Sequence, residues 1–240
     1  IICDTDLERL QVFQDKYPGI SLTRSFSEVL NDPSIEGIVI ATPAVLHYQM
    51  AKEALVSGKD VLVEKPLALN IREGKDLVET AARESRVLMV GHILQYHPAI
   101  LKLKNIINQG ELGKIQYIYS NRLNLGKIRT EENILWSFAP HDISVMLSLL
   151  GETPETIAAH GGSYLQHRLV DVTLTALTFP SGVKGHIFVS WLHPYKDQKL
   201  IVVGDRKMAV FDGTPGNGRL ALYPHTVEWI DRIPVGKKAE

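Results

Sequence analysis

Several features that mark particular classes of protein are missing from this sequence. Cys3 is the only cysteine among the 240 residues, so no internal disulfide can form, which predicts a protein of the reducing cytoplasm. No apolar run reaches the roughly 20 residues that a membrane-spanning helix needs, so we expect no membrane role. The 26 basic and 27 acidic side chains leave a net charge of −1, and no basic field indicates nucleic-acid binding. We also expect no metal site.

The first 92 residues alternate apolar strands with helical segments. The expected strands lie at 1–4, 20–23, 35–41, 61–63 and 86–90. Hydrophobic residues make up 45% of the chain and charged residues 22%, as in an ordinary globular protein. The alternation predicts an α/β domain at 1–92 of the Rossmann type, with a doubly wound parallel sheet.

From residue 93 onward the sequence becomes rich in strands. The candidate strands are 114–125, 156–161, 170–179, 183–192, 199–204, 207–211 and 219–223. Many alternate apolar and polar residues, which is typical of a half-exposed antiparallel sheet. We therefore expect an α+β domain at 93–240 with a large open antiparallel sheet, through which copies of the chain would form a dimer or tetramer. Residues 232–238 read as a linker, which suggests a truncated C-terminus.

The glycine-rich loop of dinucleotide-binding folds is absent, since no Gly-x-Gly-x-x-Gly occurs anywhere. That loop follows the first strand, which lies in the middle of such a sheet, whereas Asp4 falls where the second strand would end. A sheet without its middle strand leaves two edges unpaired. We therefore expect the chain to start late by one strand–loop–helix unit of about 30 residues.

Two charged residues follow strands of the predicted parallel sheet. Ligands bind beyond the carboxyl ends of such strands, which is where Lys65 follows Val61–Val63. A surface ion pair with Glu64 is the alternative. Asp4 can hydrogen-bond the ribose hydroxyls of NAD and repel the extra phosphate of NADP, although a turn aspartate would look the same.

His141 is the third candidate for chemistry. We expect it in the first turn of a helix at 138–150, where the amide groups disfavour imidazolium and leave the ring able to accept a proton. The alternative is a purely structural role, in which His141 packs against its neighbours in a helix that Ser137 caps and that has Pro140 in its first turn.

Taken together, these motifs resemble the glucose–fructose oxidoreductase/inositol dehydrogenase/rhizopine-catabolism (Gfo/Idh/MocA) family over nearly all of the chain. The resemblance is carried by Asp4, Ala41-Thr42-Pro43-x-x-x-His47, Glu64-Lys65-Pro66, the junction from Gly91-His92 to His97-Pro98, and His141. It implies a Rossmann domain, a nicotinamide cofactor and oxidation of a sugar or cyclitol hydroxyl.

The resemblance also implies roles for single residues. Asp4 would hold the adenosine ribose, Lys65 would be the catalytic lysine that also contacts substrate, and His141 would be the general acid/base. The remaining cofactor contacts would be Thr42, Pro43, His47, Glu64 and Pro66. Many relatives carry an aspartate where this chain has Ser137, which puts a carboxylate relay at that position in doubt.

The version of the motif around His141 looks like the branch that acts on nucleotide-activated amino sugars, such as UDP-N-acetylglucosamine 3-dehydrogenases. Arg122 is then a candidate diphosphate contact, or else a strand-surface arginine. Tyr96, Trp191 and His193 are candidates for lining the pocket, although packing explains the first two equally well. The alternatives to an NAD-dependent dehydrogenase are a non-catalytic NAD-binding regulator on the same fold and an inactive fragment that lacks the glycine loop.

Overall fold

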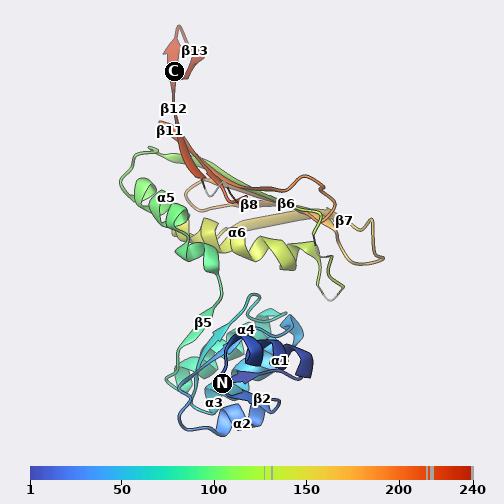
Figure 1. The fold of residues 1–240 in the computed structure, drawn as a ribbon. Coiled ribbons are helices and arrows are strands. Elements are labelled where there is room, and N and C mark those ends of the chain that lie inside the picture. The colour runs from blue at the N-terminus through green and yellow to red at the C-terminus, as the bar shows by residue number, and fades with distance from the viewer. Residues whose placement is uncertain (127, 131, 215, 217–218, 239–240) are drawn as a thin grey trace. The chain divides into compact units, whose positions relative to one another are not determined.

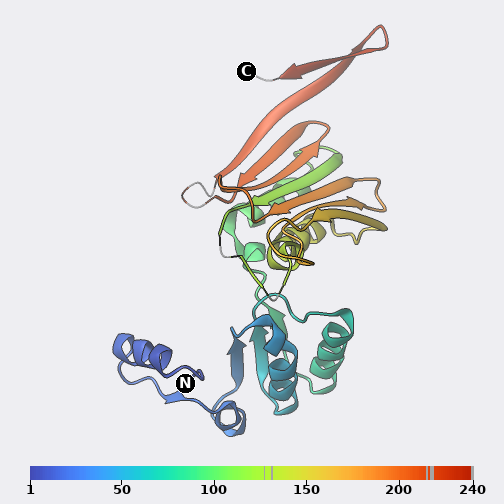
Figure 2. The same ribbon diagram turned by 90° about the vertical axis from the view of Figure 1, so that its right-hand side faces the viewer.

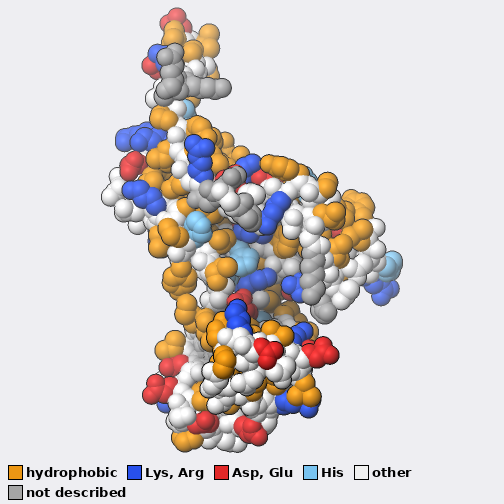
Figure 3. Space-filling view, viewed as in Figure 1, with side chains coloured by type: hydrophobic (Ala, Val, Ile, Leu, Met, Phe, Trp, Pro, Cys, Tyr) orange, Lys and Arg blue, Asp and Glu red, His pale blue; other side chains and the backbone are white. Residues whose placement is uncertain are grey.

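The computed structural model describes residues 1–126, 128–130, 132–214, 216 and 219–238. The chain divides into two compact units, residues 1–91 and residues 92–240 (Figures 1 and 2). Acidic, basic and apolar side chains are interspersed on the face drawn in Figure 3. Among the described residues, no helix is long and apolar enough to cross a membrane.

The first unit consists of short parallel strands that alternate with helices. Its elements are β1 (Ile2–Cys3), α1 (Leu7–Lys16), β2 (Leu22–Thr23), α2 (Phe26–Asn31), β3 (Gly37–Ile40), the 3₁₀ helix η1 (Ala44–Leu46), α3 (His47–Val56), β4 (Asp60–Val63), α4 (Ile71–Arg83) and β5 (Leu88–Val90). The predicted α/β class is confirmed, and its core is formed by buried side chains of β3, β4, α3 and α4.

The parallel strands form two separate sheets. β1 pairs with β2, while β3, β4 and β5 form the second sheet in that order. No strand of the described chain joins β1 to β3. Val39, on β3, is an apolar side chain that remains 69% exposed.

The second unit is built on an eight-stranded sheet. Its elements are η2 (Ile93–Tyr96), α5 (Pro98–Asn108), β6 (Ile115–Leu123), α6 (Ile134–Leu150), β7 (Thr156–Gly162), β8 (Val172–Thr178), β9 (Lys184–Ser190), β10 (Asp197–Gly204), β11 (Lys207–Asp212), β12 (Arg219–Ile230) and β13 (Ile233–Lys238). The strand order is β13-β12-β11-β10-β6-β9-β8-β7. α5 and α6 cover one face of the sheet, and the hydrophobic core lies between these helices and the sheet (Figure 1).

The sheet is largely antiparallel, as predicted, and contains one parallel pair. β6 and β9 pair in parallel, and the other neighbouring strands pair antiparallel. Parallel pairing requires a long crossover connection, and the chain between β6 and β9 provides one through α6.

The linker predicted at 232–238 is instead the strand β13, paired antiparallel with β12. The two strands are joined by Asp231 and Arg232, whose φ angles are +49° and +69°. Positive φ at both central residues is the geometry of a tight hairpin turn. Neither residue is glycine, so the sequence carries no strong signal for this turn.

Helix α6 begins at Ile134, four residues before the predicted start at 138. Asn133 caps it by accepting the backbone N–H of Trp136 at 3.0 Å, and the buried Ile134 anchors its first turn. Pro140 therefore lies inside the helix. His141 is about two turns from the N-terminus, so the expectation of a first-turn histidine was wrong.

An exposed charge cluster joins α3 to α4. The carboxylate of Asp76 accepts from the Lys52 ammonium at 2.8 Å and from the Tyr48 hydroxyl at 2.9 Å. These two hydrogen bonds hold the pKa of the Asp76 carboxyl below its ordinary value. The bond from Lys52 has the larger effect and the bond from Tyr48 the smaller. A lowered folded-state pKa stabilises the fold above the unfolded-state pKa, and this contribution is lost as the pH falls through the folded-state pKa.

We predict that Asp76→Asn lowers the melting temperature at neutral pH. The difference from wild type should begin to shrink below about pH 4, near the unfolded-state pKa, and should disappear once the pH falls below the lowered folded-state pKa. Glu79→Gln on the same helix is the control and should change little at any pH. Thermal unfolding across a pH series measures both variants. A difference that persists undiminished in acid would contradict the assignment.

Candidate functional site

The carboxyl ends of β3, β4 and β5 lie along one edge of their sheet. The register pairs Ile40 with Val63 and Val63 with Val90, so the segments that follow the three strands are neighbours. The backbone N–H of Glu64 donates to the carbonyl of Ile40 at 2.9 Å, and that of Gly91 to the carbonyl of Val63 at 2.8 Å. The predicted site residues 42–43 and 64–66 therefore share this edge.

Lys65 stands in the middle of this edge, two residues after the end of β4 at Val63. Its side chain is partly buried, and its peptide bond to Pro66 is cis. The Glu64 carboxylate lies directly over the end of β5, because a Cβ added to Gly91 would come within 3.2 Å of it. Glycine at position 91 leaves that space to Glu64.

Thr42, which follows β3, carries a side-chain hydroxyl at the same edge. Its hydroxyl oxygen is buried and has no hydrogen-bond partner among the described residues. Buried polar atoms without partners are rare, and such an atom is available to a bound water, ion or ligand. The residues at this edge thus fit part of a dinucleotide, although the sequence supplies no glycine loop for its phosphates.

Asp4 follows β1, in the other parallel sheet of the first unit. Its carboxylate accepts the backbone N–H of Asp6 at 2.9 Å and lies 3.6 Å from the guanidinium of Arg9. Asp6, not Asp4, caps helix α1. Because an arginine beside this position can accommodate the extra phosphate of NADP, Arg9 weakens the argument that Asp4 excludes that cofactor.

His47 is placed differently from its predicted role as a cofactor contact. Its side chain is only 1% exposed. Nδ1 lies 2.7 Å from the carbonyl oxygen of Pro66, and Nε2 lies 2.8 Å from that of Thr42. Both ring nitrogens are engaged by the main chain, so neither can hydrogen-bond a cofactor.

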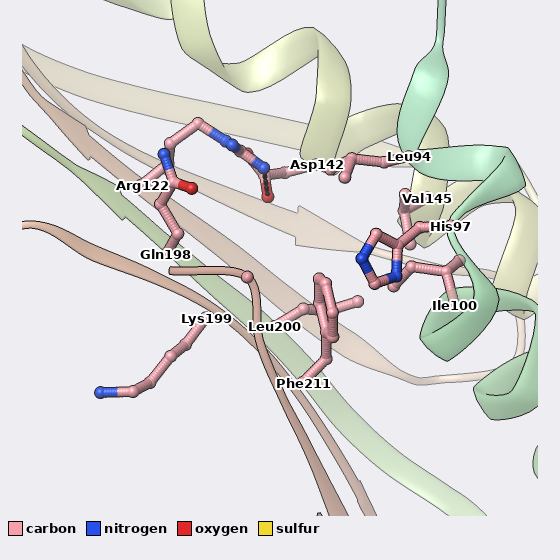
Figure 4. Close-up of a pocket in the computed structure, with 11 residues that line it drawn as sticks. Leu94, His97, Ile100, Arg122, Asp142, Val145, Gln198, Lys199, Leu200 and Phe211 are labelled. Carbon is pink, nitrogen blue, oxygen red and sulfur yellow. Dashed lines mark hydrogen bonds and ion pairs between the residues drawn. The ribbon is translucent and has the colours of Figure 1, made fainter. Parts of the chain in front are cut away.

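The second unit contains a pocket beneath α5 and α6 (Figure 4). Arg122 from β6 and Asp142 from α6 form one side of it through two hydrogen bonds of 2.7 and 3.1 Å. The two side chains are 14% and 5% exposed, so this is a largely buried, bidentate ion pair. Arg122 is therefore a largely buried, paired arginine and not a strand-surface one.

His97 lies across the pocket from this pair (Figure 4). Its ring packs against Phe211 with centroids 5.0 Å apart, and its Nδ1 accepts the backbone N–H of Ala99 at 3.2 Å. The proton of the neutral ring is therefore on Nε2. His97 was not among the predicted pocket residues. It is also the N-cap of α5, which begins at Pro98.

The other predicted residues of the second unit lie apart from this pocket lining. Tyr96 is 63% exposed in η2, whereas Trp191 is fully buried and packs edge-on against Phe138. Packing thus accounts for the tryptophan. His141, partly buried, directly precedes Asp142 on α6. Lys65 and His141 belong to different units.

Two protein-family models match this chain. A model described as "Oxidoreductase family, NAD-binding Rossmann fold" matches residues 1–92, and one described as "GFO/IDH/MocA C-terminal domain" matches residues 100–210. The chain therefore belongs to the Gfo/Idh/MocA family of oxidoreductases, as its motifs predicted.

Individual relatives agree with this assignment. The scyllo-inositol 2-dehydrogenase (NAD(+)) of Bacillus subtilis (strain 168) is 31% identical over 218 residues, which cover 86% of this chain and 64% of that protein. The chain thus spans less than two thirds of this curated relative.

Solved structures share the fold. One is the WlbA dehydrogenase from Bordetella pertussis in complex with NADH and UDP-GlcNAcA, which is 25% identical with a TM-score of 0.81 and covers 92% of this chain and 67% of that one. The UDP-N-acetylglucosamine 3-dehydrogenase GnnA from Acidithiobacillus ferrooxidans is 22% identical with a TM-score of 0.81, over 99% of this chain and 73% of that one. At this identity the second similarity shows the fold alone.

The Arg122–Asp142 pair makes a testable contribution to stability. We predict that Asp142→Asn lowers the free energy of unfolding by about 3 kcal/mol, because it leaves a nearly buried guanidinium without its counter-charge. The double variant Arg122→Met/Asp142→Leu should recover most of this loss. Chemical unfolding of wild type, Arg122→Met, Asp142→Leu and the double variant gives the coupling energy.

The exposed neighbour pair Arg83–Glu84 provides the control, since Glu84→Gln should cost less than about 1 kcal/mol. Equal losses in the free energy of unfolding for Asp142→Asn and Glu84→Gln would contradict the prediction that the buried pair contributes more than an exposed one.

Proposed function

We propose that the protein is an NAD(H)-dependent dehydrogenase that oxidises a ring hydroxyl of a sugar, cyclitol or nucleotide sugar. The observation that carries the proposal is Lys65 at the carboxyl edge of β3–β5, beside a buried Thr42 hydroxyl that lacks a partner among the described residues. The family membership and the dehydrogenase relatives support the same reaction class.

The reaction divides into tasks that these side chains suit. The nicotinamide, when bound, accepts the hydride that leaves the carbinol carbon. Lys65 donates a hydrogen bond to the substrate oxygen and stabilises the negative charge that develops there. His141 accepts the hydroxyl proton as general base, and the C–O bond becomes a carbonyl. Asp4 and Thr42 hold the cofactor.

Charge balance in the pocket of the second unit indicates the kind of ring that it would bind. Arg122 is neutralised by Asp142, and Lys199 is paired with Asp197 at 2.9 Å. The Nε2–H of His97 remains as a donor above the apolar surface of Phe211 and Leu200. We assign to this pocket an uncharged polyhydroxylated ring, as in inositols and N-acetylhexosamines. A 3-hydroxyl of a UDP-N-acetylhexosamine is one such target.

A second copy of the chain is the partner that we propose for the open face of the sheet. Tyr117, Leu174 and Tyr223 are exposed large side chains on strands β6, β8 and β12. Light scattering of wild type and of Leu174→Glu tests this. A dimer or tetramer that the glutamate dissociates supports the interface, and a wild-type monomer contradicts it.

The catalytic proposal predicts that Lys65→Met lowers kcat by about 10²- to 10⁴-fold, because the substrate oxygen loses its positively charged donor. Lys75→Met, on the exposed side of α4, is the matched control and should retain full turnover. NADH formation is measured with scyllo-inositol, myo-inositol and UDP-N-acetylglucosamine as substrates.

Full turnover in Lys65→Met would contradict the mechanism. NAD binding without turnover of any polyol or nucleotide sugar by wild type would instead favour the non-catalytic regulator.

A further inference from the structure

The ring of His47 connects two segments that end neighbouring strands. It is the first residue of α3, and its two nitrogens reach the carbonyl of Thr42 after β3 and the carbonyl of Pro66 after β4. The second of these carbonyls belongs to the residue that directly follows Lys65. A single buried side chain thus contacts the main chain of two neighbouring segments at the proposed catalytic edge.

Both contacts are close. The two ring nitrogens lie 2.7 and 2.8 Å from the carbonyl oxygens, within hydrogen-bonding distance. Which nitrogen donates depends on the tautomer. In either tautomer the buried ring lies between the two carbonyls and connects the segments that carry them.

We propose that His47 is a positioning residue, whose buried ring ties the segment after β3 to the segment after β4 and thereby holds Lys65 in place. It does not touch substrate or cofactor. The proposal relies on the proposed function only in treating Lys65 as catalytic, because the two contacts between ring and carbonyls stand without it. Displacing a catalytic group by about 1 Å can lower a rate by about a hundredfold.

The positioning is tested with His47→Gln, whose single nitrogen cannot reach both carbonyls, and with His47→Leu, which has no donor. We expect kcat to fall about tenfold and about a hundredfold respectively, with KM nearly unchanged, at temperatures where circular dichroism shows both variants folded. His160→Gln, an exposed histidine on β7, is the control. Unchanged kcat in folded His47→Leu would overturn the proposal.

A readout without turnover separates this proposal from the proposed function. Acylation of lysine amines, followed by mass spectrometry, should modify Lys65 faster in His47→Leu than in wild type, with Lys75 unaffected. Equal Lys65 rates in the two proteins would overturn the positioning role. If wild type turns over no substrate, the proposed function fails, while the acylation result still decides the role of His47.

Discussion

The parallel register of three short strands determines where the chemistry of the first unit lies. Because β3, β4 and β5 run in the same direction with their ends aligned, Thr42, Lys65 and Gly91 follow them along one edge. None of these residues is near another in sequence. The buried ring of His47 then fixes this edge by hydrogen bonds to two of its carbonyls. The sheet brings the groups together, and the histidine limits their movement.

In the second unit a buried ion pair has the corresponding role. Arg122 on the sheet and Asp142 on α6 join the helix to the sheet one residue away from His141. The same pair neutralises the pocket beside it, so an apolar floor and a few donors remain for a ligand. A polyhydroxylated ring matches such a surface because it has apolar faces and many acceptor oxygens.

The sequence was informative where the signals are local. Strand, polar residue and proline follow each other at 61–66, so the position of Lys65 at a strand end could be predicted. The start of α6 could not, because Asn133 and Ser137 are both acceptable caps and the burial of Ile134 favours the first. The contacts of His47 were also unpredictable, since their acceptors are main-chain carbonyls, which every residue carries.

The central claim is that Lys65 belongs to a dehydrogenase, and isotope transfer tests it most directly. A polyol or nucleotide sugar with deuterium on its carbinol carbons is incubated with the protein and NAD⁺, and the cofactor is analysed by mass spectrometry. We predict deuterated NADH from wild type and very little from Lys65→Met. Stable binding of NAD⁺ by wild type with no deuterium transferred from any such substrate would contradict the account.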